Sequence, residues 1–437
     1  MVLTRRHNPT LIALASLLAV GLSYLSIRAA LASHYANQGT LEGYEKATRL
    51  EPSNPETWRR LGDSWQNDLQ NGDPQRAIEA YRTALSLDSK SVQAWLGLAS
   101  VYEGQGKLEA ANKALLSAKR AYPISADVSW RYANFLLRKG ELNPAFDEAR
   151  QALENEPQRA WGTFALFQRF DSDVDELLNR LLPRQQIVYL DVIWGLDGEG
   201  RPSEALKVWD RLFELDREIP QRRVPTGTYQ VTSVILFSLV DQLLAKGYIS
   251  EARRVWDEVL AFMNLSQQRD APESLVWDGG FETDLSGGFS WRIDAPSGSL
   301  TRFTRMIKHS GARALEITFD GKHNVDFHGV CQFVAVEPDT TYDFSAWLRT
   351  ENITTDRGIF LRLSAPQDRG PQIVTPELTG THPWTKVGFR WKTSKNMHLL
   401  QICVKRLPSY NAYNTIAGTA WVDDVQLVPI EAVTGPF

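Results

Sequence analysis

Aromatic and hydrogen-bonding side chains that alternate with apolar ones are the residues of this chain best suited to chemistry. Trp347 and Arg349 share one phase of an alternating run, and Phe360 and Arg362 share one phase of the next. Aromatic rings stack on the apolar faces of sugars, and guanidinium or amide groups bind sugar hydroxyls. This mixture predicts a face that binds a polysaccharide or oligosaccharide. The alternatives are that these are ordinary solvated residues, or that Trp347 packs beneath the helical part of the chain. Gln401 is a further candidate for this face, and the candidates for its rim are Gln332, His323, Asn324, Asp326 and His328.

Motifs of covalent or metal catalysis are absent from the sequence. The chain contains no Gly-x-Ser-x-Gly elbow, P-loop, His-Glu-x-x-His or Cys-x-x-Cys. His323, Asp326 and His328 come nearest to a metal cluster, but two close histidines beside Asn324 more often form a polar rim. The sequence therefore favours a protein without enzymatic activity. An unrecognised glycan-active enzyme is the alternative, because paired carboxylates cannot be found without coordinates.

Composition narrows the possible partners. The chain has 437 residues, with 48 Lys plus Arg against 52 Asp plus Glu and a formal charge of -4. No basic field exists to neutralise a phosphate backbone, so nucleic acid is not an expected partner. The two cysteines, Cys331 and Cys403, permit either one disulfide or two packed thiols. A chain of this length holds two or three domains.

The sequence near the N-terminus predicts a helix that crosses a membrane. An uncharged apolar run, residues 11–27, follows Arg5, Arg6 and His7, and its length is at the short limit for crossing a bilayer. Positive charge before the run predicts a cytoplasmic N-terminus in a bacterial inner membrane, with the bulk of the chain periplasmic or extracytoplasmic. Ala30 and Ala32 before Ser33 resemble a cleavage site, so a removed signal peptide and a secreted chain are the alternative.

Three segments repeat the same apolar pattern. Trp58, Leu61 and Trp65 match Trp95, Leu98 and Tyr102, and a third copy begins at Trp130, with Pro123 to Pro157 giving a period of 34 residues. This pattern resembles the tetratricopeptide repeat family, whose paired antiparallel helices stack into a superhelix. About three extra residues in segment 66–73 predict a longer turn in the first full repeat. Segments 200–215 and 247–262 resemble degenerate copies of the second helix of a repeat.

The resemblance to tetratricopeptide repeats implies a concave face formed by the first helix of each pair. That face would hold an extended peptide or the tail of another protein, the alternative being an architectural spacer. It maps to Glu56, Arg59, Asp63, Gln66, Gln93, Leu96, Ser100 and Glu103.

Helical spacing gives way to strand spacing within residues 275–291. Downstream, short alternating runs are separated by turn clusters, which is typical of a β-sandwich. Within the run 342–348, the set Tyr342, Phe344, Ala346 and Leu348 should face the core. Strands are expected at residues 314–319, 329–336, 341–349, 358–365, 384–392, 398–405 and 419–428.

Three motifs carry a second resemblance. They are Asp278-Gly-Gly-Phe-Glu282, the run from Val334 to Trp347, and Trp421-Val-Asp-Asp-Val-Gln-Leu427. Together they resemble the galactose-binding-like jelly-roll carbohydrate-binding modules, a superfold that also serves protein contacts. This resemblance implies a structural calcium ion held by Glu282, the carbonyl of Gly280 and Asp423. The alternative is that Glu282 caps a turn and Asp423 accepts backbone hydrogen bonds.

The sequence as a whole predicts a multidomain protein: an all-α tetratricopeptide-type solenoid, then an all-β jelly-roll sandwich, with an N-terminal transmembrane helix. The expected boundaries are 1–32 for the cytoplasmic stub and anchor, 33–160 for the repeats, 161–270 for degenerate helical repeats and 272–437 for the sandwich. The expected function is a membrane-anchored, extracytoplasmic scaffold that presents a glycan-binding module, within polysaccharide assembly or export. A protein-interaction scaffold with a purely structural sandwich is the alternative.

Overall fold

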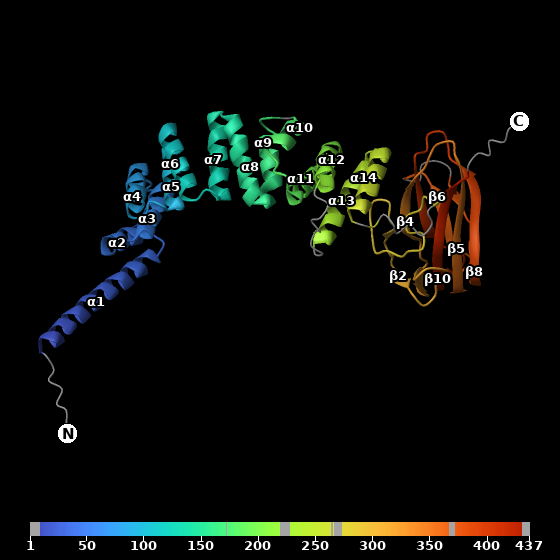
Figure 1. Ribbon diagram of the computed structural model, residues 1–437. Coiled ribbons are helices and arrows are strands. Elements are labelled where there is room, and N and C mark those ends of the chain that lie inside the picture. The colour runs from blue at the N-terminus through green and yellow to red at the C-terminus, as the bar shows by residue number, and fades with distance from the viewer. Residues whose placement is uncertain are drawn as a thin grey trace, which may run out of the picture. The chain divides into compact units, whose positions relative to one another are not determined.

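A computed structural model describes residues 9–171, 173–218, 228–263, 265, 273–366 and 372–430. The chain divides into two compact units, Met1–Val188 and Tyr189–Phe437. Helices occupy the first unit and the start of the second, and two antiparallel sheets follow (Figure 1). The predicted fold class is therefore confirmed.

The first helix, α1 (Pro9–Ala36), joins an apolar segment to the first helical hairpin. Residues 13–36 of this helix are long and apolar enough to cross a membrane, a property that anchors and signal sequences share. Its C-terminal turns pack on α2 (Leu41–Leu50): Ala32 is only 3% exposed, and the Arg28 guanidinium donates to the Leu50 carbonyl. The basic residues 5–7 lie outside the described residues.

Three helix pairs follow, as the repeat pattern predicts. The side chains of Asn54 and Asp73 cap two of these helices, each followed by a proline in the first turn. Six residues separate the helices of the first pair, three those of the second and two those of the third, so the expected longer turn is confirmed. The pairs are α3 (Pro55–Asn67) with α4 (Pro74–Leu87), α5 (Val92–Gly104) with α6 (Leu108–Ala121), and α7 (Ala126–Lys139) with α8 (Leu142–Asn155).

The segment predicted as degenerate repeats is also helical, and it is divided between the two units. The unit boundary after Val188 leaves its first helices with the repeats, whereas the last three belong to the same compact unit as the sandwich. The two degenerate second helices are α12 and α14. Trp209 of α12 and Trp256 of α14 are fully buried. The elements are η1 (Pro157–Arg159), α9 (Ala160–Phe167), α10 (Val174–Arg180), α11 (Gln186–Gly198), α12 (Pro202–Glu218), α13 (Thr228–Ala245) and α14 (Ile249–Phe262).

Two five-stranded antiparallel sheets form the sandwich. We call the sheet of order β1-β4-β9-β6-β7 sheet A and the sheet of order β2-β3-β10-β5-β8 sheet B. The seven predicted strands are present, and three further strands, β1, β2 and β7, complete the sheets. The strands are β1 (Arg292–Ile293), β2 (Ser299–Thr304), β3 (Ala314–Asp320), β4 (Phe327–Ala335), β5 (Thr341–Ile353), β6 (Phe360–Ser364), β7 (Ile373–Val374), β8 (Gly380–Lys392), β9 (Leu399–Arg406) and β10 (Ala417–Pro429).

The sandwich core lies between the sheets. Tyr342, Phe344, Ala346 and Leu348 of β5 are each at most 1% exposed and join this core, as strand alternation predicts. Burial of such apolar area is the main stabilising contribution to the fold. The outward-facing set of each strand remains for binding.

Helices α13 and α14 pack on the loop that opens the sandwich. The Trp256 ring of α14 lies edge-on to Trp277 and Phe289, at centroid distances of 5.8 and 6.1 Å. Gly288, at φ +57°, lies so close that a Cβ atom there would stand 2.6 Å from the Trp256 ring. The sandwich and these two helices therefore share one packed interior.

Candidate binding cleft

The outer face of sheet A carries a cleft of roughly 640 Å³, with one wall formed by α13. Side chains from β1, β4, β6 and β9 form its remaining surface. The lining residues are Asp241, Leu244, Ala245, Arg292, His328, Cys331, Phe333, Arg362, Pro366, Leu399, Gln401, Cys403 and Lys405. The cleft combines apolar surface with several cationic groups and one amide.

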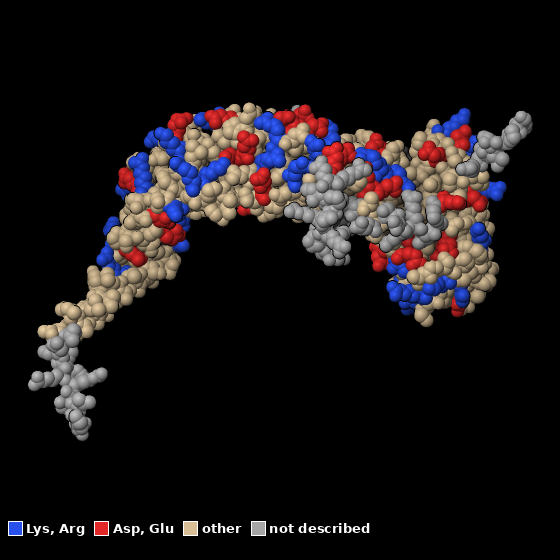
Figure 2. Space-filling view, in the orientation of Figure 1, with Lys and Arg blue, Asp and Glu red and all other residues tan. Residues whose placement is uncertain are grey.

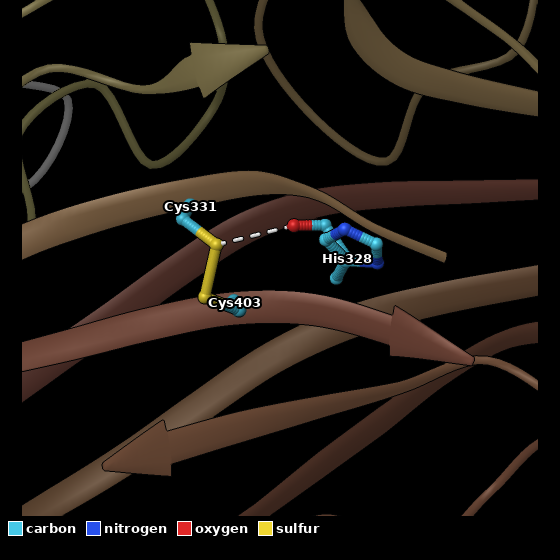
Figure 3. The surroundings of a disulfide bond; sticks show 3 residues. All are labelled: His328, Cys331 and Cys403. Atoms are coloured by element: carbon cyan, nitrogen blue, oxygen red, sulfur yellow. Dashed lines mark hydrogen bonds between the residues drawn. A yellow bond between two sulfur atoms is a disulfide. The ribbon is translucent and has the colours of Figure 1, made fainter. Parts of the chain in front are cut away.

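A disulfide between Cys331 and Cys403 crosses the cleft surface from β4 to β9. The two cysteines are directly paired in the antiparallel register, with their Cα atoms 4.2 Å apart. Figure 3 shows the bond beside His328, whose carbonyl oxygen lies 3.5 Å from the Cys331 sulfur. The sequence left open whether these residues are bonded, and in the structure they are.

An ion pair fixes the α13 wall against the sheet. The Asp241 carboxylate accepts hydrogen bonds from the Arg292 guanidinium and, at 2.9 Å, from the backbone N–H of Gly288. Burial raises the pKa of Asp241 even though Arg292 and Gly288 act to lower it. The Arg292 guanidinium also lies 4.7 Å from the centroid of the Phe333 ring, a cation–π contact that orients this ring.

Three of the predicted glycan-binding residues meet in this cleft. Arg362 on β6 is paired with Cys403 on β9, and Gln401 on β9 is paired with Phe333 on β4. His328 lies at the start of β4 and is exposed. Strands adjacent in sheet A thus bring together residues that are up to 73 positions apart in the chain.

The prediction that Gln332 lies at the rim is wrong. Its side chain is fully buried on the inner face of sheet A, where its amide donates to the Trp277 carbonyl at 2.6 Å. The reason is a β-bulge at the start of β4, where the three steps from Phe327 to Val330 span the same distance as the two steps from Arg406 to Val404 on β9. The extra residue reverses the alternation, so His328 faces outward but Gln332 faces the core.

Four other candidates do not line the cleft. Phe360 is only 4% exposed, so its ring is not available for stacking. Asn324 holds the loop before β4: its amide donates to the Ser409 carbonyl at 2.8 Å, and its oxygen accepts from Arg406 at 2.8 Å. The His323 imidazole is hydrogen-bonded to the Asp320 carboxylate, and Asp326 is exposed. Neither His323 nor Asp326 lines the cleft. His323, Asn324 and Asp326 lie in the loop between β3 and β4, whereas Phe360 is the first residue of β6.

Trp347 and Arg349 lie on sheet B, so they cannot act together with the sheet A residues. The imidazole of His309 stacks on the Trp347 ring at a centroid distance of 3.9 Å, and Trp384 approaches the same imidazole edge-on. Arg349 lies over the Trp421 ring at 5.4 Å. One face of Trp347 is therefore covered by a protein ring.

Sequence reasoning missed Asp241, Arg292, Phe333 and Lys405. Phe333 and Lys405 carried a usable signal, because each follows a cysteine by two residues and therefore shares its strand face. Arg292 lies on a strand of two residues, too short for any alternation to appear. Asp241 belongs to a helix whose position beside sheet A no local pattern encodes.

The residues predicted to hold calcium join the two ends of the sandwich. The Glu282 carboxylate accepts from the backbone N–H of Ala312 at 2.6 Å, and Asp423 accepts from those of His309 and Ser310 at 2.7 and 3.1 Å. Burial raises the pKa of Asp423 to about 6. Both carboxylates thus accept hydrogen bonds from backbone N–H groups of the same loop. This arrangement is the alternative to calcium binding that was considered from the sequence.

A small cavity adjoins these carboxylates. It measures roughly 290 Å³, and Gly280, Glu282 and Asp424 are among its lining residues. Oxygen-rich surroundings of this kind suit a calcium ion, although no group of three carboxylate, His or Cys side chains converges within the described ranges. The calcium ion stays a prediction.

The predicted concave face of the repeats is largely bonded within itself. Arg59 forms ion pairs with Glu56 and Asp63. The Gln66 amide donates to the Ser100 hydroxyl at 2.8 Å. Glu103 of α5 forms an ion pair with Arg138 of α7. Acidic and basic side chains are interspersed over the visible face of the repeats (Figure 2). Leu96 is buried and Gln93 is exposed. A groove of roughly 250 Å³ is lined by Leu96, Ser100 and Glu103 of this face.

Comparisons with known proteins match parts of the chain, and a family model supports the repeat assignment. A family model described as tetratricopeptide repeat matches residues 66–123. The nuclease WapA of Bacillus subtilis subsp. natto (strain BEST195), described as tRNA(Glu)-specific, is 28% identical over 187 residues, which are 41% of this chain. The chain spans only 8% of the length of that protein.

Solved structures are similar to portions of the chain, at low TM-scores. MamA is similar with 22% identity and a TM-score of 0.26, over 41% of this chain and 89% of its own. TmCBM61, solved in complex with β-1,4-galactotriose, is similar with 17% identity and a TM-score of 0.26, over 36% of this chain and 99% of its own.

Proposed function

We propose that this chain is a non-enzymatic, membrane-anchored scaffold whose sandwich binds a glycan in the cleft on sheet A. The observation that carries the proposal is the composition of the cleft. An oriented aromatic ring, Phe333, lies beside an amide, Gln401, and the guanidinium of Arg362 on one shallow surface. Such a surface offers stacking for the C–H face of a sugar and hydrogen-bonding groups for its hydroxyls.

The location of the cleft favours a glycan over an extended peptide. Peptides that add to a sheet bond to the backbone of an exposed edge strand. The cleft lies instead over β4 and β9, which have hydrogen-bonded neighbours on both sides. Recognition there must come from side chains, and polar groups beside an aromatic ring suit a hydroxyl-rich ligand.

The structure of α1 supports an anchor that is retained. The small-x-small motif ending at Ala32 lies within a continuous helix, and Ala32 is buried against α2. Cleavage sites are ordinarily exposed and flexible. We therefore place the N-terminus in the cytoplasm, residues after about 30 outside it, and the cleft in the path of polysaccharide assembly or export.

Affinity electrophoresis of the full chain in detergent against a panel of soluble polysaccharides tests the binding proposal. Phe333→Ala and Gln401→Ala should each weaken retention by the binding polysaccharide about tenfold, a loss of about 1.4 kcal/mol. Arg390→Ala is the matched control, because Arg390 is an exposed cation on sheet B. Equal retention of the Phe333 variant and the wild type, with both folded, would contradict the proposal.

Calcium is a further part of this proposal. An ion bound by Glu282, the Gly280 carbonyl and Asp423 would cross-link the first and last segments of the sandwich. Chelation by EDTA should then lower the melting temperature, and added calcium should restore it. A melting temperature that EDTA leaves unchanged, with no metal by elemental analysis, would mean that backbone hydrogen bonds alone join these segments.

The repeats are a second candidate site, for a protein partner. The observation that favours it is the groove between α5 and α7, where Trp130, Arg131 and Asn134 face Leu96 and Ser100. A photo-crosslinker placed at Arg131 should capture a protein in the envelope of the native host. Capture of nothing beyond lipid and the chain itself would leave the repeats as a spacer.

A further inference from the structure

A loop with two exposed tyrosines lies at one end of the sandwich. Loop 407–416 joins β9 to β10, and its Tyr410 and Tyr413 are 100% and 94% exposed. Leu407 of the same loop is also exposed. The ten residues of the loop include no charged side chain. This end of the sandwich therefore presents an uncharged aromatic surface, and none of these residues lines the cleft on sheet A.

Hydrogen bonds hold the base of this loop in one conformation. Ser409 is only 2% exposed. Its backbone N–H donates to the Asn324 side-chain oxygen at 3.0 Å, and its hydroxyl donates to the Asp356 carboxylate at 2.6 Å. At the end of the loop, the Ile416 N–H donates to the His323 carbonyl at 3.0 Å. The two tyrosines thus protrude between fixed points of the loop.

A buried arginine supports the same end of the sandwich. Arg406, the last residue of β9, is fully buried, and its guanidinium donates to the side chains of Asn324 and Thr355 at 2.8 and 3.1 Å. Its hydrogen-bond partners among the described residues are neutral oxygens, and its Nε has none there. Burial of a cation without a hydrogen-bonded carboxylate is destabilising. That the chain keeps such a residue beneath the loops indicates that their shape matters for function.

We propose that loop 407–416 docks on the surface of the lipid bilayer to which α1 anchors the chain. Tyrosine rings favour the boundary between lipid chains and headgroups, where the ring is buried and the hydroxyl stays hydrated. The neutral Asn, Ser and Thr side chains of the loop suit the headgroup layer. The inference rests on the retained anchor of the proposed function and adds a second membrane contact.

The anchor makes a small contact of this kind sufficient. Two tyrosines and one leucine bury too little apolar area to hold a free protein on a membrane. A chain tethered by α1 meets the bilayer at a high effective concentration, so a small surface is enough. The adjoining loops carry Asp326 and Asp356 as well as Lys322 and Arg357, so they offer no net positive charge to anionic lipid. The contact should therefore form on neutral lipid and persist at high salt.

The full chain, reconstituted into phosphatidylcholine vesicles, tests this contact by fluorescence quenching. A fluorophore on Ala412→Cys, between the two tyrosines, should be quenched about twofold by nitroxide-labelled lipid and be shielded from iodide in the water. The native cysteines are bonded to each other and do not take up the label.

The same fluorophore on Ser394→Cys is the matched control. Ser394 is exposed in the turn between β8 and β9, at the opposite end of β9 from the loop, so its probe should respond only to iodide. Tyr410→Ser combined with Tyr413→Ser should abolish lipid quenching at position 412. The melting temperature of this variant should not change, because neither ring is buried.

The outcomes separate this inference from the anchor on which it rests. Flotation of the vesicles reports the anchor, and a chain that does not float with them would overturn both. A chain that floats while its probe at position 412 responds only to iodide would overturn lipid docking in favour of a protein partner, with the anchor still supported. Quenching that requires phosphatidylglycerol in the vesicles would show an ionic contact and would overturn docking by an uncharged surface.

Discussion

Asp197 of α11 shows how burial changes the chemistry of a single residue. The side chain is 3% exposed, and its carboxylate accepts a hydrogen bond from the Ser238 hydroxyl. Burial raises the pKa of Asp197, and this effect outweighs the opposing effect of Ser238. The folded state therefore holds its proton to higher pH than the unfolded state does, and the free energy of unfolding falls as pH rises between the two pKa values.

Asp197→Asn should remove this dependence. The variant keeps an acceptor for Ser238 but has no charge to desolvate, so its stability relative to wild type should increase from about pH 3.5 to pH 7. Melting curves of both proteins over this range measure the effect. A difference in melting temperature that is constant across the range would contradict the raised pKa.

Gln332 shows where prediction from sequence fails for a single residue. Alternation places residues 328 and 332 on one face, but the bulge after Phe327 puts the second in the core. A bulge depends on hydrogen bonding to a distant strand, β9, and no local signal reveals it. Arg362 and Gln401 were found because alternation alone suffices where the strand is regular.

At the scale of elements, the repeats depend on the close approach of helices around Tyr81. This fully buried ring of α4 lies between Gly62 of α3 and Gly97 of α5. A Cβ atom at position 97 would stand 2.6 Å from the Tyr81 hydroxyl oxygen. That hydroxyl lies 2.7 Å from Asp63 and 2.8 Å from Gln66, so it cannot move without loss of a hydrogen bond.

Gly97→Ala should therefore destabilise the repeats by about 1–3 kcal/mol through overpacking. Gly104→Ala in the same helix is the matched control, because nothing lies within 4 Å of its added methyl group. Its effect should be neutral or stabilising, since alanine favours the helix. Chemical denaturation followed by circular dichroism compares the two variants, and equal destabilisation would contradict the packing described around Tyr81.

The helices were largely predictable, and some strands were not. Period, prolines and capping residues are local signals, so the six helices of the three repeats lie where the pattern placed them. The strands β1 and β7 have two residues each and exist only through pairing with β4 and β6. The sequence of strand β2, Ser-Leu-Thr-Arg-Phe-Thr, has no regular alternation of apolar and polar residues, which explains why it was not predicted.

At the scale of the whole molecule, alternation could not tell which sheet each strand joins. Trp347 and Phe360 have similar patterns, yet one lies on sheet B and the other on sheet A. Strand order follows from the chain topology, which local sequence does not encode. The contribution of α13 to the cleft was also beyond prediction, because it depends on tertiary packing.

The proposal that the anchor is retained has consequences for the intact chain. Because Ala32 is packed within the α1–α2 hairpin, the chain in cells should remain full length and sediment with membranes. Protease added outside the inner membrane should degrade the chain beyond residue 30 and spare the segment before it. A soluble product whose N-terminus is Ser33 would show that the helix is a removed signal peptide.

A crystal structure of the chain with a bound oligosaccharide tests the central claim most directly. The sugar should lie on the outer face of sheet A, with a ring against Phe333, hydroxyls at Gln401 and Arg362, and α13 beside it. A sugar bound instead over Trp347 on sheet B, or at the exposed Tyr410 and Tyr413, would contradict the assignment of the cleft.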